Sequence, residues 1–247
     1  MLDIAKDPME VAPTAHYTMG GVVVDPETHA TEVEGLFAAG EVTGGLHGAN
    51  RLGGNSLAET VIAGRRVGEA AAAFASDAEV VVRSRGVIRD AIDELDSLVH
   101  PGPELARPLQ RRLRDLMWER YGVVRDGHGL TQGRAELGEI RSMLDDVDVR
   151  PGAEGWSDLA HLLDLRGGLL AAEATIRGAL ERTETRGAHN RSDFPELDPD
   201  LTVNFHARLV DGRLSLQRRP VPAPTPELDE LTRTSPSVEA EAGHLLE

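Results

Sequence analysis

The chain contains no cysteine. Disulfide bonds, thiol catalysis and iron–sulfur ligation by its own side chains are therefore excluded. Aromatic residues make up only 3% of its 247 residues, whereas hydrophobic residues make up 40%. A core must then be built from Leu, Val, Ile and Ala, and this composition favours helices with a small sheet over an aromatic-rich β fold.

Basic residues are also few, with 26 Lys and Arg against 42 Asp and Glu and a net charge of −16. This balance disfavours a surface for nucleic acid or an anionic membrane, but it leaves local binding of a dicarboxylate open. No apolar run approaches the roughly 20 residues that a membrane span needs, and no basic region followed by an apolar one opens the chain. We therefore expect a cytoplasmic protein, or one that is peripheral to a membrane through another subunit.

Three ligand-binding motifs are missing as well. The sequence has no G-x-G-x-x-G turn for a dinucleotide pyrophosphate, no phosphate-binding P-loop and no cluster of residues with metal-ligand spacing. A complete dinucleotide-binding unit is therefore not expected within these residues.

The most informative stretch covers residues 35–59. An apolar run over residues 36–40 predicts a buried strand, and a glycine-rich turn follows it. Ser56 and Glu59 match a capping box, which predicts that a helix begins at Ser56. The positive end and free N–H groups of such a helix suit an electron-rich flavin edge or a carboxylate.

Arg51 lies in the glycine-rich turn, between Gly48 and Gly53. A lone Arg in a loop is usually solvated. Here its neighbours have little side chain to shield it, and a planar guanidinium can grip a carboxylate through two parallel hydrogen bonds. The turn is therefore a candidate anion-binding site.

Several of these segments resemble the flavoprotein subunits of succinate dehydrogenase and fumarate reductase and the related L-aspartate oxidase. The strongest matches are HYTMGG at residues 16–21, AGE at 39–41 and GLHGANRLGGNSLAE at 45–59. Weaker ones follow at residues 116–118, 122–125, 186–189 and 193–195, so the resemblance covers nearly the whole chain.

The resemblance assigns roles to particular side chains. It implies that His16 and Arg51 hold the substrate carboxylates, with Thr18 in support, and that Glu41 bonds the ribose of FAD. Without it, spacing alone slightly favours a structural histidine for His16, and Glu41 is explained as a solvated carboxylate. It further implies that the start of the predicted helix meets the pyrimidine edge of the flavin through Asn55, Ser56 and Leu57.

In that family the dinucleotide-binding half, a histidine that can bond FAD covalently and a mobile capping domain with a proton-transferring arginine precede the HYTMGG segment. The resemblance therefore implies a C-terminal portion that needs the upstream FAD-binding half or a partner subunit, and no catalytic residue is assigned within this chain. The implied activity is hydride transfer between FAD and a C4 dicarboxylate, succinate or fumarate, and a further implied partner is an iron–sulfur subunit. L-aspartate oxidation is the near alternative, and a non-catalytic scaffold or assembly module is the alternative from another class.

The expected fold class is α+β. It comprises part of an FAD-binding α/β domain (residues 1–75), an antiparallel bundle of four helices (76–185), a docking segment with a β-hairpin (186–219) and an extended, then disordered tail (220–247). The first boundary rests on a second capping box at Ser76. Arg186 and His189 are expected to dock the bundle onto the flavin domain, because no carboxylate partner is evident near them in sequence.

Overall fold

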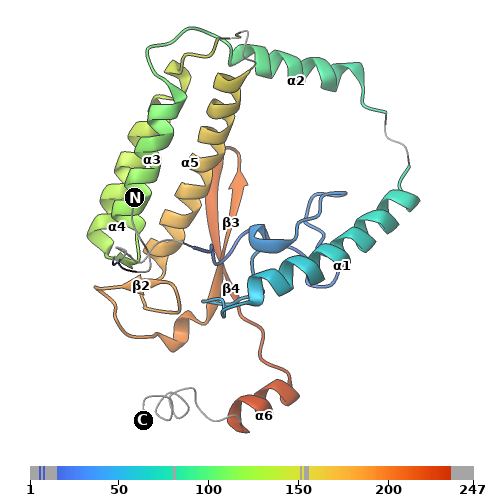
Figure 1. Ribbon diagram of the computed structural model, residues 1–247, viewed down its shortest axis with the longest axis vertical. Helices are drawn as coiled ribbons and strands as arrows, with labels where there is room; N and C mark the ends of the chain where they lie inside the picture. The colour runs from blue at the N-terminus through green and yellow to red at the C-terminus, as the bar shows by residue number, and fades with distance from the viewer. Residues whose placement is uncertain are drawn as a thin grey trace.

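The structure is a computed structural model that describes residues 6, 8, 16–79, 82–150, 152 and 156–234. It combines helices with short strands, which confirms the mixed fold class (Figure 1). The helices are α1 (Asn55–Asp77), α2 (Arg85–Ser97), α3 (Ala106–Tyr121), α4 (Gly127–Ser142), α5 (Ser157–Glu181) and α6 (Pro226–Thr234), and the strands are β1 (Val124–Arg125), β2 (Asn190–Arg191), β3 (Val203–Val210) and β4 (Arg213–Pro220).

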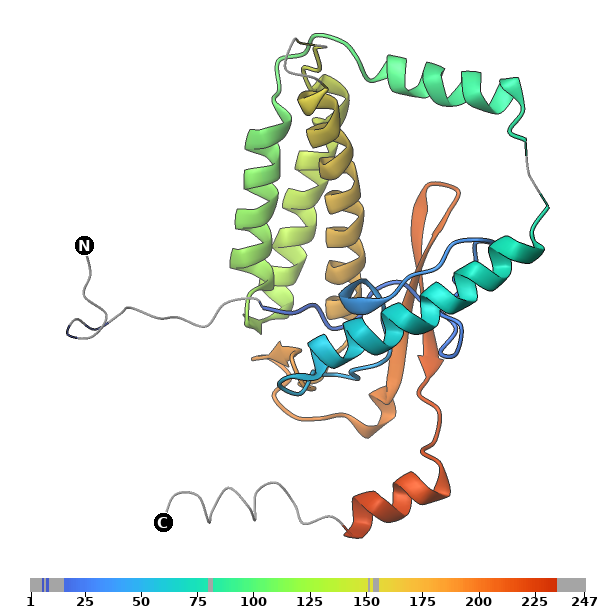
Figure 2. The same ribbon diagram turned by 45° about the vertical axis from the view of Figure 1, so that its right-hand side comes forward.

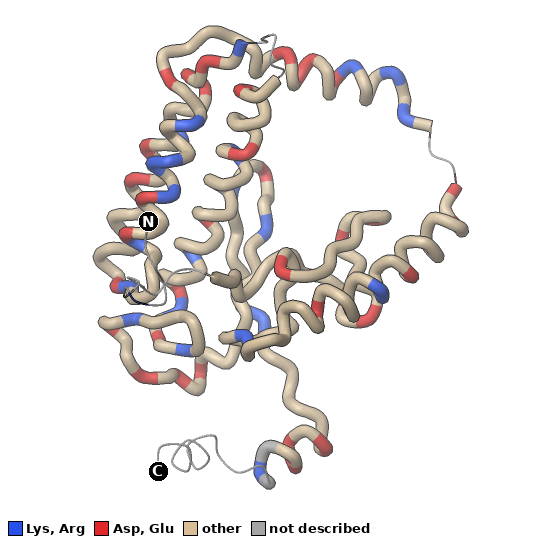
Figure 3. The backbone as a smooth tube through the Cα atoms, viewed as in Figure 1, with Lys and Arg blue, Asp and Glu red and all other residues tan. Residues whose placement is uncertain are grey.

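The hydrophobic core lies between α3, α4 and α5, which run side by side (Figures 1 and 2). Apolar residues recur at helical spacing on the facing sides of these helices, and Leu130, Ile140 and Ile176 are completely buried there. Charged residues cover the outer sides (Figure 3), where Arg120 pairs with Glu136 at 3.0 Å. These three helices form the bundle that the sequence predicts.

The first of the four helices predicted for the bundle corresponds to α2, and it does not join the other three. It extends away from α3 and α5 and has no buried residue (Figure 1). Its apolar residues Ile88, Ile92 and Leu95 share one face but stay 42% to 51% exposed. Helical periodicity therefore predicted the amphipathic helix correctly, but it could not identify what that face packs against.

Helix α1 lies along the irregular segment of residues 16–54 (Figure 2). The buried strand predicted at residues 36–40 is wrong, because Leu36 is 52% exposed and a 3₁₀ helix, η1 (Gly40–Val42), begins where the strand should end. Among the described residues this segment forms only isolated bridges, such as Ala30 with Phe37, and a strand needs a continuous partner.

The capping box predicted at Ser76 is also wrong. Ser76 lies inside α1, where its hydroxyl donates to the carbonyl of Ala72 at 2.9 Å. The alanine run at residues 70–73 favours continuing the helix to Asp77. The real cap further along is Ser84, whose side chain accepts the N–H of Val87 at the start of α2.

The predicted hairpin is confirmed as the antiparallel pair β3–β4. Asp211 and Gly212 form its turn with φ values of +49° and +73°, the left-handed pair that a type I′ turn requires. The hairpin lies beside α5 (Figure 1), and Arg182, just after α5, donates to the carbonyl of Val203 at 2.5 Å. This contact ties the hairpin to the bundle.

The predicted extended tail is wrong over residues 226–234, which form α6. Pro226 begins the helix, Glu227 in its first turn complements the helix dipole, and Arg233 pairs with Asp229 at 2.7 Å. Pro220 ends β4 and residues 221–225 have no regular secondary structure, whereas residues 235–247 of the predicted tail lie outside the described residues. Within the described part of the chain, none of the helices has the length and apolar character needed to span a membrane.

Two adjacent leucines of α5 provide a test of this core. Leu169 is 1% exposed and Leu170 is 39% exposed. We expect Leu169→Ala to lower the free energy of unfolding by about 3 kcal/mol, because it leaves a cavity among α3, α4 and α5. Leu170→Ala should lower it by less than about 1 kcal/mol. Urea denaturation followed by circular dichroism measures both, and equal losses would contradict this core.

Candidate functional site

The candidate site begins where the segment of residues 16–21 meets the chain around η1. The N–H of Val22 donates to the carbonyl of Val42 at 2.7 Å, and the N–H of Gly44 donates to the carbonyl of Val22 at 3.0 Å. A Cβ at Gly21 would lie 2.1 Å from the carbonyl oxygen of Val42. Only glycine allows this approach, which brings the HYTMGG segment against the start of the glycine-rich turn.

A buried carboxylate, Glu59 of α1, lies at the centre of the site. One of its oxygens, Oε2, accepts from the hydroxyl of Tyr17 at 2.8 Å and bonds Nε2 of His47 at 2.7 Å. The other oxygen, Oε1, accepts from the hydroxyl of Thr43 at 3.4 Å. The Glu59 side chain is only 2% exposed, so these contacts replace its hydration.

The protonation states follow from this arrangement. Burial works to raise the pKa of Glu59, but the hydrogen bonds from Tyr17 and His47 outweigh it, and the net pKa lies below the usual value. Burial and then the Glu59 carboxylate raise the pKa of Tyr17 to about 12. At neutral pH Glu59 is therefore charged, while Tyr17 remains a neutral phenol that donates its proton.

Arg51 lies on the ring of Tyr17, with its Cζ atom 4.5 Å from the ring centroid. Its Nη1 donates to the carbonyl of Leu52 at 3.0 Å. Its Nε is buried and has no hydrogen-bond partner among the described residues. Such an orphaned donor calls for an explanation, and a carboxylate oxygen is the acceptor that best suits this edge of a guanidinium.

Helix α1 begins one residue earlier than predicted, and the capping box at its start is wrong. Gly54 is the N-cap, with φ of +83° and no side chain to cap the helix, and Ser56 is already the second helical residue. Glu59 does not turn back to the helix start, because it bonds Tyr17 and His47 instead. The N–H of Asn55 donates to the carbonyl of Leu52 at 3.3 Å.

The first N–H groups of an α-helix have no partner within the helix, and no side chain of the N-cap residue meets them here. Four glycines of the turn leave space around the backbone, since a Cβ on any of them would meet no atom within 4 Å: Gly45, Gly48, Gly53 and Gly54. Beside them the side chains of Leu52 and Leu57 are 74% and 75% exposed. Open backbone, free N–H groups and exposed apolar side chains fit a flat ring with polar edges.

The other predicted residues lie on both sides of this centre. His16 is exposed, precedes Tyr17 directly, and makes no hydrogen bond to another described residue. The backbone N–H of Thr18 donates to Oε1 of Glu41 at 2.9 Å, which links a predicted substrate residue to a predicted cofactor residue. The side chain of Glu41 remains exposed.

The residues that converge next to Arg51 were not predicted from the sequence. Tyr17, Thr43, His47 and Glu59 are not among the site residues predicted from the sequence. A weak signal exists in hindsight, since Tyr17 and His47 both fall within the segments that carry the family resemblance. Their convergence on one carboxylate depends on three-dimensional packing, so spacing in the sequence does not show it.

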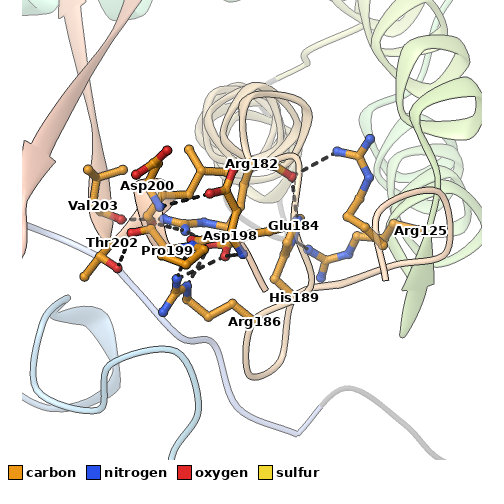
Figure 4. Close-up of polar contacts among 12 residues, drawn as sticks. Arg125, Arg182, Glu184, Arg186, His189, Asp198, Pro199, Asp200, Thr202 and Val203 are labelled. Carbon is orange, nitrogen blue, oxygen red and sulfur yellow. Dashed lines mark hydrogen bonds and ion pairs between the residues drawn. The ribbon is translucent and has the colours of Figure 1, made fainter. Parts of the chain in front are cut away.

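A second buried carboxylate, Glu184, organises the loop after α5 (Figure 4). It accepts from Arg186 at 2.7 and 3.0 Å and from the backbone N–H of Asp198 at 2.9 Å, and Arg182 pairs with it as well. The expectation that Arg186 has no nearby carboxylate is therefore wrong. Its partner lies two residues earlier in the chain.

His189 closes the other side of this loop (Figure 4). Burial lowers its pKa, with the nearby arginine charges acting in the same direction. The neutral ring accepts from Nη1 of Arg125 through Nδ1 at 3.0 Å and donates from Nε2 to the carbonyl of Arg182 at 3.1 Å. These contacts join the connection between α3 and α4 to the end of α5.

The loop touches the glycine-rich turn through the two residues between Arg186 and His189. The N–H of Ala188 donates to the carbonyl of Ala49 at 2.9 Å. A Cβ at Gly187, which has φ of +56°, would lie 2.3 Å from that carbonyl oxygen. The segment therefore contacts the turn two residues away from Arg51 through the backbone of Ala188, and not through the side chains of Arg186 and His189, which were expected to dock it.

Two family models match the chain. The model described as fumarate reductase flavoprotein C-term matches residues 110–231, and the model described as FAD binding domain matches residues 2–57. A fumarate reductase (CoM/CoB) chain from Methanothermobacter marburgensis is 42% identical over 204 residues, which are 81% of this chain and 36% of that protein. The succinate dehydrogenase flavoprotein subunit of Rickettsia conorii is 32% identical over 253 residues, covering 95% of this chain and 42% of that protein.

Solved structures agree with these matches. A chain of E. coli quinol fumarate reductase superposes with a TM-score of 0.84 at 34% identity, covering 91% of this chain and 40% of that one. A chain of the Mycobacterium smegmatis Sdh1 complex gives a TM-score of 0.81 at 34% identity, with coverage of 97% and 43%. The present chain thus spans between 36% and 43% of the length of these four proteins.

The contact between the loop and the turn is tested by Gly187→Ala. The added methyl group must displace the carbonyl of Ala49, so we expect the hydrogen bond from Ala188 to break and the Ala188 amide to exchange faster with deuterium. Gly138→Ala is the matched control, because a Cβ at Gly138 of α4 meets no atom within 4 Å. Unchanged exchange in Gly187→Ala would contradict the docking geometry.

The role of Glu184 is tested by pH. Hydrogen bonds from Arg186, the Asp198 N–H and Arg182 outweigh burial and lower the pKa of Glu184, so its stabilising contribution is present above about pH 4 and is lost as the pH falls through the folded-state pKa. We expect Glu184→Gln to cost about 3 kcal/mol of unfolding free energy at pH 7, and to differ less from wild type as the pH falls.

The control for this series is Glu196→Gln, which removes the same charge from an exposed side chain. It should lower the unfolding free energy by less than about 0.5 kcal/mol. Urea unfolding between pH 7 and pH 3 measures all three proteins. A pH-independent difference between wild type and Glu184→Gln would show that the carboxylate charge is not what holds the loop.

Proposed function

Because this chain belongs to the succinate dehydrogenase and fumarate reductase flavoprotein family, we propose that it supplies the part of an FAD-dependent oxidoreductase that grips a C4 dicarboxylate beside the flavin. The observation that carries the proposal is Arg51, whose guanidinium lies on Tyr17 with its Nε unpartnered among the described residues, next to the uncapped start of α1. A cation held on an aromatic ring then lies four residues before a positive helix end.

In this proposal Arg51 binds one substrate carboxylate through its free edge, and His16 reaches the other end of the dicarboxylate. Both withdraw electron density from the carbon skeleton, which favours negative charge as it develops during the reaction. Thr18 has an indirect role in this proposal, because its backbone N–H donates to the carboxylate of Glu41, the residue proposed to bind the ribose of FAD. The exposed position of His16 leaves it accessible to a substrate.

Bound FAD would supply the hydride chemistry, accepting or donating the pair of electrons that the dicarboxylate loses or gains. Glu41 would hold its ribose hydroxyls. The free backbone N–H groups of Ser56 and Leu57 at the start of α1 would meet its pyrimidine edge, and Asn55, whose own N–H bonds the carbonyl of Leu52, would lie beside them. The open glycines and the exposed Leu52 and Leu57 support this assignment.

Partners form the remaining part of the proposal. The relatives include proteins named as flavoprotein subunits and a chain titled quinol fumarate reductase. By analogy we propose that this chain works with the upstream FAD-binding part of the fold and with an iron–sulfur subunit that exchanges electrons with the flavin. Because cysteine is absent from the chain, any iron–sulfur cluster ligated by thiolates must lie in another chain or segment. A location in the cytoplasm, at the inner membrane through such a subunit, belongs to the same proposal.

The proposal is tested in a chimera that joins this chain to the segment preceding the matched region in the Methanothermobacter marburgensis relative. We expect the chimera to bind flavin and to reduce fumarate with a reduced dye. Arg51→Ala should keep the flavin but lower the rate at least about a hundredfold, because a charge-stabilising donor is lost. Absorbance of bound flavin and of the dye measures both properties.

Arg65→Ala is the control, since this arginine lies on α1 with its side chain 82% exposed and pairs only with Glu69 among the described residues. It should reduce fumarate at the wild-type rate. Unchanged turnover in Arg51→Ala would remove this arginine from the site, and a flavin-loaded chimera without dicarboxylate turnover would refute the proposed substrate class.

A further inference from the structure

We propose that Glu59 is a positioning residue for Arg51, acting through Tyr17 and His47, so that the carboxylate-gripping guanidinium is held in place by a buried negative charge it does not touch. This inference deepens the proposed function and rests on it for the nature of the ligand. The contacts that carry it are internal to the chain, and they can be tested separately.

The chain of contacts is continuous. Oε2 of Glu59 holds the hydroxyl of Tyr17 and Nε2 of His47 together, at 2.8 and 2.7 Å. The two rings meet edge to face, with centroids 5.4 Å apart and planes at 80°. The face of Tyr17 carries Arg51 at 4.5 Å. The charge-assisted hydrogen bond fixes where the end of the ring lies, and the edge-to-face contact with His47 restrains rotation of the ring about its own axis, so the plane that supports Arg51 is held.

The position of Glu59 in the chain adds a second constraint. Glu59 belongs to the first two turns of α1, the helix whose free start lies next to Arg51 in sequence. The carboxylate therefore sets the distance between the helix start and the guanidinium. In the proposed function these two groups meet the flavin edge and the substrate respectively, and hydride transfer requires that their separation be fixed.

A purely structural role does not account for all of these contacts. The hydroxyl of Thr43 satisfies a backbone carbonyl, that of Gly40, at 2.8 Å, and bonds Glu59 only at 3.4 Å. The two shorter bonds to Glu59 come from Tyr17, whose ring lies under Arg51, and from His47, whose ring packs against Tyr17. A buried charge is costly unless its partners are held well, and here its strongest partners are the residues that orient the candidate ligand-binding group.

The experiment follows the tyrosine ring signals of the full chain by NMR while malonate, a non-reacting dicarboxylate, is added. Only two tyrosines occur, Tyr17 and Tyr121, so the signals are few and Tyr17→Phe assigns them. In the wild type we expect saturable shifts of the Tyr17 signals. Arg51→Lys should move these signals without malonate and abolish the response to it, because the planar grip is lost.

Glu59→Gln should also move the Tyr17 signals and weaken malonate binding about two- to fivefold, the change expected when a cation–aromatic contact loses its alignment. Glu69→Gln is the matched control: it removes the same charge from the same helix at a side chain that is 68% exposed, and it should bind malonate as the wild type does. Equal losses in the two variants would overturn the inference, since a change in net charge alone would then explain both.

The variant Tyr17→Phe gives an independent arm that does not depend on how Glu59→Gln folds. It keeps the ring beneath Arg51 but removes the hydroxyl that Glu59 holds. Calorimetric titration with malonate should show a loss similar to that in Glu59→Gln, and the double variant should lose little more. Full additivity of the two losses, in variants with wild-type circular dichroism, would overturn the inference.

Failure of the inference and failure of the proposed function give different results. If Glu59→Gln leaves the Tyr17 signals and malonate affinity as in the wild type, the positioning role is refuted while the dicarboxylate site stands. A different result is that malonate moves no Tyr17 signal in the wild type, while the substitutions Arg51→Lys and Glu59→Gln each move the Tyr17 signals without malonate. In that case the dicarboxylate assignment of Arg51 fails and the positioning contact is supported.

Discussion

The bond between the buried Glu59 carboxylate and the hydroxyl of Tyr17 is the interaction on which the candidate site depends. Arg51 lies in a glycine-rich turn, and its guanidinium packs on the ring of Tyr17. Because Glu59 bonds the hydroxyl of that ring, the bond also determines the position of the guanidinium. The glycines leave the backbone open, and only side-chain contacts can then give the turn order. A carboxylate whose sequence position predicts a helix cap thus organises the site instead.

The helical bundle contributes to the same site from a distance. Its core of aliphatic side chains holds α5 rigidly, and Glu184 anchors the loop that follows. Through Gly187 and Ala188 this loop contacts Ala49, two residues before Arg51. The turn is therefore held on one side by α1 and on the other by the bundle, which gives the C-terminal half of the chain a function in shaping a site that it does not line.

Much of this architecture could be predicted from the sequence. Apolar periodicity predicted helices that correspond to α2 to α5, the glycine-rich turn with Ser56 and Glu59 predicted a helix at the position of α1, and Asp211-Gly212 predicted the hairpin, because these signals are local. The strand at residues 36–40 and the place of α2 in the bundle could not be predicted, since each depends on what packs against it. The convergence of Tyr17, His47 and Glu59 was missed for the same reason: the three residues span 42 positions, and only the fold brings them to one point.

A crystal structure of the flavin-loaded chimera with malonate bound tests the central claim most directly. A carboxylate oxygen of malonate should lie within about 3 Å of Nε of Arg51, with the guanidinium still on the ring of Tyr17 and the flavin edge at the start of α1. Malonate bound elsewhere, or Arg51 turned away from Tyr17 to solvent in that complex, would contradict the account.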